Sequence, residues 1–106
     1  MEEKIKMAFG NIVMSPQGTL SPEKTLELAN IYLENAFSTT DSDIALVLCR
    51  DTELSLYQAN KSAKQEKNRT VVGEIATAYI GLGKLLESLH QIKGAYASFR
   101  KAEKLG

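Results

Sequence analysis

The residues best suited to chemistry in this sequence are its one histidine, His90, and its one cysteine, Cys49. A histidine serves as a general base or a metal ligand, and a cysteine serves as a nucleophile when a base lies beside it. The chain has no second histidine, and Cys49 lies within an apolar helical pattern. We therefore expect His90 to be a turn residue between two helices and Cys49 to be a small buried hydrophobe, with no metal site and no cofactor.

Paired carboxylates are another source of acid–base chemistry, and Asp41 and Asp43 form such a pair. Both stand where a helix is expected to begin. Aspartates at this place accept hydrogen bonds from free amide groups and complement the positive end of the helix. Because no neighbouring pattern indicates the apolar pocket that would tune one of them for catalysis, we expect a protein that is not an enzyme.

Two glycines, Gly81 and Gly83, lie inside a helical apolar pattern rather than after a strand, so they do not indicate a phosphate-binding loop. Each glycine within a helix costs about 1 kcal/mol relative to alanine. A close crossing with a neighbouring helix would offset this cost, and we predict such a crossing here.

The composition is that of an ordinary globular domain, with 106 residues of which 43% are hydrophobic and 25% charged. The net charge is zero, so the chain lacks the overall positive field that favours nucleic-acid binding. A local basic cluster is interpreted as a solvated helix end; its members are Lys61, Lys64, Lys67 and Arg69. No apolar run approaches the ~20 residues of a membrane span. A single cysteine and a charged start without a signal peptide predict a cytoplasmic protein.

Apolar residues recur every three or four positions after the first twenty residues, and this spacing predicts an all-α fold. We expect two antiparallel helix hairpins, over residues 21–66 and 70–105, in one domain over residues 21–106. An irregular N-terminal arm is expected over residues 1–20, because turn-forming residues surround Pro16. The hairpins form either a stacked superhelix fragment or a four-helix bundle.

Each predicted helix has an expected core face and a start signal. Ser21 followed by Pro22 suits the beginning of the first helix, because serine caps it and proline fits the first turn. The expected core residues are Leu28, Ile31, Tyr32 and Ala36 in the first helix; Ile44, Val47, Leu48, Leu54 and Tyr57 in the second; Val72, Ile75, Tyr79, Leu82, Leu86 and Leu89 in the third; and Ile92, Ala95, Phe99 and Ala102 in the fourth.

Residues 76–106 resemble a tetratricopeptide repeat, a helix-turn-helix unit with small and large residues at fixed places. The residues that carry the resemblance are Tyr79, Leu82, Gly83 and Leu86 on the first helix and Ala95, Phe99 and Ala102 on the second. The earlier hairpin follows the same first-helix spacing with Leu28, Ala29 and Tyr32. One departure is that His90 stands where the family places glycine.

Such repeats are scaffolds whose first helices line a concave surface for a peptide or a partner helix. The resemblance therefore implies a non-catalytic protein–protein interaction module with a protein or peptide partner. The groove residues that it implies are Leu26, Asn30, Leu33 and Glu34 from the first hairpin and Thr77, Ile80, Lys84, Glu87 and Ser88 from the second.

Two alternatives stay open at this point. The first is a structural, self-associating helical domain, alone or as part of a larger helical array. It is based on residues that lie off the main apolar faces and need either a second layer or a homo-oligomer to cover them: Leu26, Leu33, Leu46 and Leu56. The second is an enzyme or ligand carrier, which requires a deep polar cavity around His90 or Cys49.

Overall fold

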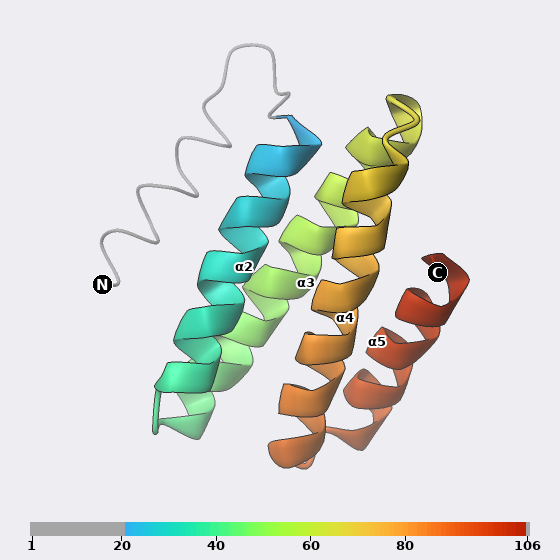
Figure 1. Ribbon diagram of the computed structural model, residues 1–106. Helices are drawn as coiled ribbons and strands as arrows, with labels where there is room; N and C mark the ends of the chain where they lie inside the picture. The colour runs from blue at the N-terminus through green and yellow to red at the C-terminus, as the bar shows by residue number, and fades with distance from the viewer. Residues whose placement is uncertain (1–20, 106) are drawn as a thin grey trace.

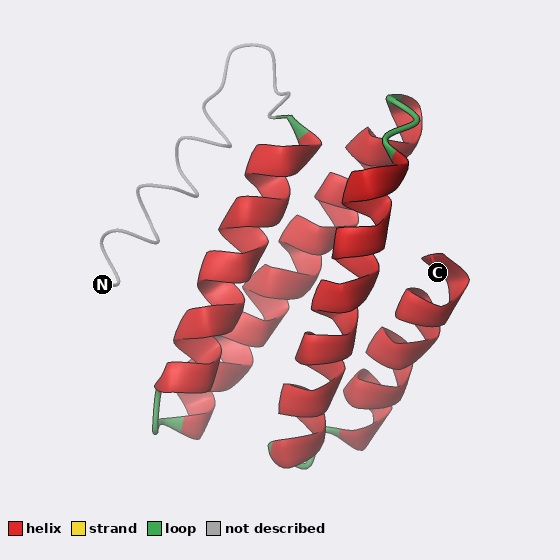
Figure 2. Ribbon diagram, viewed as in Figure 1, coloured by secondary structure: helices red, strands yellow, loops and turns green. Residues whose placement is uncertain are grey.

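Four α-helices make up the part of the chain that the computed structural model describes, residues 21–105. They are α2 (Pro22–Ser38), α3 (Ser42–Gln65), α4 (Arg69–Ser88) and α5 (Ile92–Leu105) (Figure 1). No strand occurs among these residues (Figure 2), which confirms the predicted all-α fold. The arm predicted over residues 1–20 lies outside the described range.

The helices form two antiparallel hairpins that stack side by side. The main packing contacts join α2 to α3 and α4 to α5, while α4 also packs on α3 and touches α2. In Figure 1, α2 and α4 run in the same direction, and α3 and α5 run in the opposite one. The two hairpins expected from the sequence are confirmed, with their boundaries displaced by only one or two residues.

Side chains cap the helix beginnings. The Ser21 hydroxyl accepts a hydrogen bond from the amide of Lys24 at 3.2 Å, as predicted. The Asp41 carboxylate accepts from two amides of the first turn of α3, at 2.9 and 3.2 Å, so capping accounts for this residue. Asn68 caps α4 by accepting from the amide of Val71 at 3.2 Å.

Two residues in the left-handed backbone region end α3 and α4. Lys67 has a φ of 57° and His90 a φ of 63°. In each turn the next residue donates its amide to the carbonyl oxygen five residues earlier. The donor–acceptor distance is 2.8 Å both from Asn68 to Ala63 and from Gln91 to Leu86. This is the hydrogen-bond pattern that closes many helix ends and that usually has glycine at the left-handed position. The prediction that His90 is a turn residue is confirmed.

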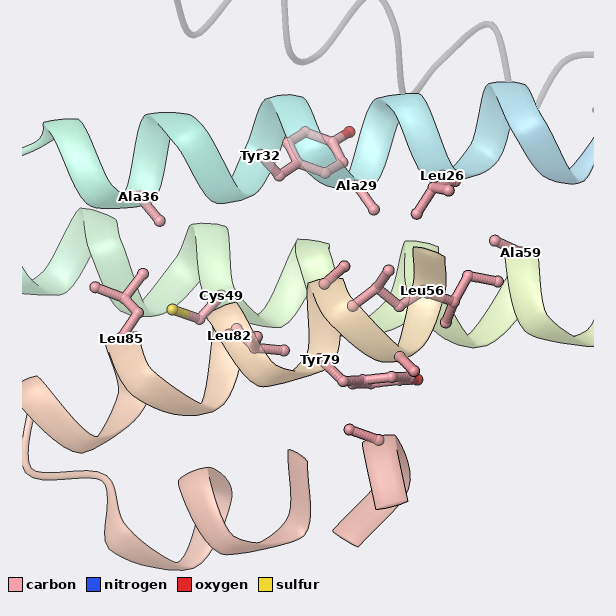
Figure 3. Packing of buried hydrophobic residues seen from close by; sticks show 14 of the residues in the cluster. Leu26, Ala29, Tyr32, Ala36, Cys49, Leu56, Ala59, Tyr79, Leu82 and Leu85 are labelled. Carbon is pink, nitrogen blue, oxygen red and sulfur yellow. The ribbon is translucent and has the colours of Figure 1, made fainter. Parts of the chain in front are cut away.

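The core runs through all four helices, with most of its residues on α2, α3 and α4 and with Ala95 and Ala102 on α5 (Figure 3). Its largest fully buried apolar side chains are Tyr32, Leu56, Ile75 and Leu82. The expected core face of α4 is largely confirmed, because only Val72 and Leu89 of that set are partly buried rather than fully buried.

Of the five core residues predicted on α3, Leu48 is buried and confirmed, whereas the prediction is wrong for the other four. The outward-facing residues of this helix include Ile44, Val47, Leu54 and Tyr57, with exposed fractions of 50%, 57%, 43% and 58%. The buried side of α3 instead consists mainly of small residues: Ala45, Leu48, Cys49, Thr52, Ser55, Leu56, Ala59 and Ala63. Because α3 packs against both α2 and α4, small side chains let both neighbours approach closely.

Two other predicted core residues are exposed, Ile31 on α2 and Ile92 on α5. By contrast, the four leucines that the sequence places off the main apolar faces are all at least partly buried. Leu26 and Leu56 are buried, and Leu33 and Leu46 pack partly buried against the core. The fold itself therefore covers these leucines largely or fully, and they do not require a second chain.

The predicted helix crossing at the two glycines of α4 is confirmed, and the glycines serve different neighbours. Gly83 is covered by the ring of Phe99 from α5, and Gly81 lies beneath Leu33 from α2. Gly83 thus lets the second hairpin close, whereas Gly81 lies at the contact between the two hairpins with room for a methyl group.

Candidate functional site

The groove predicted from the sequence corresponds to one face formed by α2 and α4. Most of its predicted residues are exposed there: Asn30, Glu34, Thr77, Ile80, Lys84, Glu87 and Ser88. Leu33 is half-buried. Leu26 is only 4% exposed, so it packs beneath this face and offers little surface to a partner.

Leu33 and Gly81 join the two helices at the floor of this face. A Cβ atom placed on Gly81 would lie 3.4 Å from a terminal methyl carbon of Leu33, which is ordinary van der Waals contact. Because α4 has no side chain at this point, a methyl group of Leu33 lies over Gly81 with room for one more carbon atom between them. The floor between the helices is therefore apolar here.

Sequence analysis missed Phe37 as a member of this face. Its ring is 55% exposed near the end of α2. Leu26, Asn30, Leu33 and Phe37 follow one another at steps of four, three and four residues, so they share one side of the helix. This spacing is visible in the sequence, but Phe37 is not among the groove residues that the resemblance implies. Together, Leu33, Phe37 and the 41% exposed Ile80 give the face three apolar contact points.

A second exposed surface lies on the opposite side of α3 from the core. We call it the outer seam of α3. Its residues alternate in steps of four and three along the helix and are all exposed: Asp43, Val47, Arg50, Leu54, Tyr57, Lys61 and Lys64. Sequence reasoning missed this surface because it assigned the large apolar residues of α3 to the core.

A shallow depression of about 320 Å³ lies beside the outer seam, between α3 and α5, with Arg50, Glu53, Leu54, Tyr57 and Lys101 around it. Lys101 donates to the Glu53 carboxylate at 3.1 Å, and both side chains are more than two-fifths exposed. A half-exposed ion pair of this kind contributes little stability. The depression includes neither His90 nor Cys49, so it is not the polar cavity that the enzyme hypothesis requires.

The Cys49 thiol is in surroundings that suppress its reactivity. Burial, helped by the nearby Glu53 carboxylate, raises the pKa of the Cys49 thiol from 9.0 to about 11. At neutral pH it is therefore the unreactive thiol form. His90 is exposed in a turn. Among residues 21–105, no three His, Cys, Asp or Glu side chains lie together as a metal site requires.

Two further findings bear on the class of protein. None of the helices described here is both long enough and apolar enough to cross a lipid bilayer. Comparison with protein-family models gives no matching family, and comparison with curated proteins and with solved structures gives no similar chain. Functional assignment therefore depends on the surfaces themselves.

Proposed function

We propose that this protein is a non-catalytic interaction module that binds a partner protein on the face formed by α2 and α4. The observation that carries the proposal is the cluster of Leu33, Phe37 and Ile80 on this face. Leu33 packs on Gly81, while Phe37 and Ile80 project large apolar surfaces outward beside it. Exposed apolar clusters with polar neighbours are typical of protein-binding sites.

The arrangement of the helices supports a tetratricopeptide-like module. The first helices of the two hairpins, α2 and α4, run in the same direction and meet along one face (Figure 1). Gly83 and Phe99 close the second hairpin in the manner that the resemblance implies. His90 adopts the left-handed backbone that favours glycine, which the family has at this place.

The chemistry of the face favours an amphipathic helix or a short peptide as the ligand. Its polar residues carry both signs of charge, with Glu34 on α2 and Lys84 and Glu87 on α4. A mixed rim of this kind does not favour a strongly charged partner such as nucleic acid. Apolar anchors spaced as on one helical turn would fit against Phe37 and Ile80, and the rim would set their orientation.

The proposal is tested by affinity capture from cytoplasmic extract, with quantitative mass spectrometry of what the full chain retains. Three variants are compared with wild type: Ile80→Asp, Phe37→Asp and a control, Leu54→Asp on the outer seam. Ile80 and Leu54 are matched, because both are mid-helix aliphatic residues with exposed fractions of 41% and 43%. Circular dichroism checks that each variant is folded.

We expect a set of proteins that wild type and Leu54→Asp retain and that both Ile80→Asp and Phe37→Asp lose. The proposal is wrong if folded groove variants retain the same proteins as wild type. It is equally wrong if only Leu54→Asp loses them, because the binding face would then be α3.

A further inference from the structure

We infer that the outer seam of α3 is a homodimer interface, on which the α3 helix of a second copy packs antiparallel to the first. This inference does not depend on the proposed function, because it concerns the opposite face of the molecule. It begins from the finding that α3 has two apolar sides, of which the fold uses only the one made of small residues.

The spacing of the outer seam is that of a helix-pairing surface. Alternating steps of four and three residues keep side chains on one narrow stripe that a second helix can follow. From Asp43 to Lys64 the seam extends ~32 Å at 1.5 Å per residue. Its middle is formed by Val47, Leu54 and Tyr57, whose exposed fractions lie between 43% and 58%. A single exposed apolar residue needs no explanation, but three large apolar residues on one stripe opposite the core, interrupted only by Arg50, do.

The charges at the two ends of the seam select a second copy in antiparallel orientation. The N-terminal end carries Asp43, and the C-terminal end carries Lys61 and Lys64, all exposed. Antiparallel packing brings Asp43 of each copy to Lys61 of the other. Parallel packing would place like charges together at both ends. In the antiparallel pair, the positive end of each α3 dipole also lies beside the negative end of the other, which is favourable. In a parallel pair, ends of the same sign would lie together.

The antiparallel alignment that pairs Asp43 with Lys61 also makes the middle of the seam complementary to itself. With the twofold axis beside residue 52, Val47 lies opposite Tyr57 of the second copy, and Leu54 lies opposite Arg50. The long aliphatic part of Arg50 can cover Leu54 while its guanidinium group stays in water. Each pair occurs twice, as a symmetric dimer requires. The depression between α3 and α5 borders this stripe at Arg50, Leu54 and Tyr57.

Charge reversal tests the interface, with the oligomeric state of the full chain measured by sedimentation equilibrium over micromolar to millimolar concentrations. We expect wild type to dimerise. Asp43→Lys and Lys61→Asp each place like charges at both ends of the dimer, and each should weaken it by about tenfold or more. Combining both substitutions in one chain should restore it.

Mixing the two single variants provides a second arm, which tests the charge contacts. One chain then has Lys at both positions and the other has Asp at both, so a heterodimer is attractive at both ends in either orientation, and the double variant decides between the orientations. We expect the mixture to form heterodimers that neither variant forms as strongly alone, detected by native mass spectrometry. A parallel pair gains nothing from the double substitution in one chain, because like charges would again meet at both ends.

Leu54→Asp should leave the chain monomeric, whereas the matched Ile80→Asp should dimerise like wild type. A wild-type chain that is monomeric at every concentration overturns the inference. So does a dimer that ignores Leu54→Asp or that is lost with Ile80→Asp. Because self-association and partner capture are measured in separate assays, failure here leaves the proposed partner-binding face untouched.

Discussion

The ring of Phe99 lies directly on the bare backbone of Gly83. A Cβ atom added at Gly83 would stand 2.6 Å from the nearest ring carbon, well inside van der Waals contact. Two residues away, a Cβ atom on Gly81 would meet Leu33 at 3.4 Å, which is ordinary contact. The two glycines share a helix and differ in the space around them, so the same substitution should have opposite effects at the two positions.

Gly83→Ala is expected to destabilise the protein by about 1–2 kcal/mol, because overpacking outweighs the gain in helix propensity. Gly81→Ala is expected to stabilise it by up to about 1 kcal/mol. Urea unfolding followed by circular dichroism gives both values. Phe99→Leu should reduce the cost of Gly83→Ala in the double variant, whereas equal effects at the two glycines would contradict the packing described here.

His90→Gly should raise the free energy of unfolding by about 1 kcal/mol. His90 has a φ of 63°, a conformation that costs a side-chain-bearing residue about 1–2 kcal/mol and glycine much less. In a domain of this size the melting temperature should rise by roughly 4–8 °C per kcal/mol. His90→Ala is the control, since alanine keeps the same strain. A stabilisation as large with alanine as with glycine would mean that strain is not the cause.

Tyr32→Phe should leave stability unchanged or raise it by up to about 1 kcal/mol. The Tyr32 hydroxyl is buried and finds no hydrogen-bond partner among the described residues. A buried polar group without a partner costs free energy, so removing it costs nothing. Thermal unfolding of Tyr32→Phe is compared with that of Tyr96→Phe, an exposed site. A loss of more than about 1 kcal/mol at Tyr32 would reveal a partner for the hydroxyl.

Stability should fall at alkaline pH. Burial raises the pKa of Cys49 to about 11 and that of Tyr79 to about 12, so both groups hold their protons more tightly in the folded state than in the unfolded state. Their contribution is complete below about pH 9 and is lost as pH rises through these values. Urea unfolding at about pH 8 and about pH 11 measures the loss. Cys49→Ala should make it smaller, and an unchanged loss would exclude Cys49 as a source.

The sequence predicted the hairpins well because their signals are local. The caps at Ser21 and Asp41, and the small and large residues around Gly83, act within one helix or between neighbours in the chain. These features depend on propensity and spacing, which a sequence states directly.

The face of α3 could not be predicted in the same way. Its two sides have the same helical periodicity, and hydrophobicity favours the larger residues such as Val47 and Leu54 for the core. The structure instead buries small residues such as Ala45 and Ser55, on the same side as Cys49, whose burial the sequence did predict. That choice depends on the closeness of two neighbouring helices, which is a tertiary property. Phe37 was missed for a related reason, since its role depends on where α4 lies relative to α2.

The central claim is that the face of α2 and α4 binds a partner protein, and that the chain is folded without that partner. The most direct measurement is isothermal titration calorimetry with a captured partner, using wild type, Ile80→Asp and the matched Leu54→Asp. We expect Ile80→Asp to raise Kd at least tenfold, by about 1.4 kcal/mol or more, with the Tm nearly unchanged, and Leu54→Asp to bind each partner like wild type. Equal affinity for wild type and folded Ile80→Asp would contradict the claim.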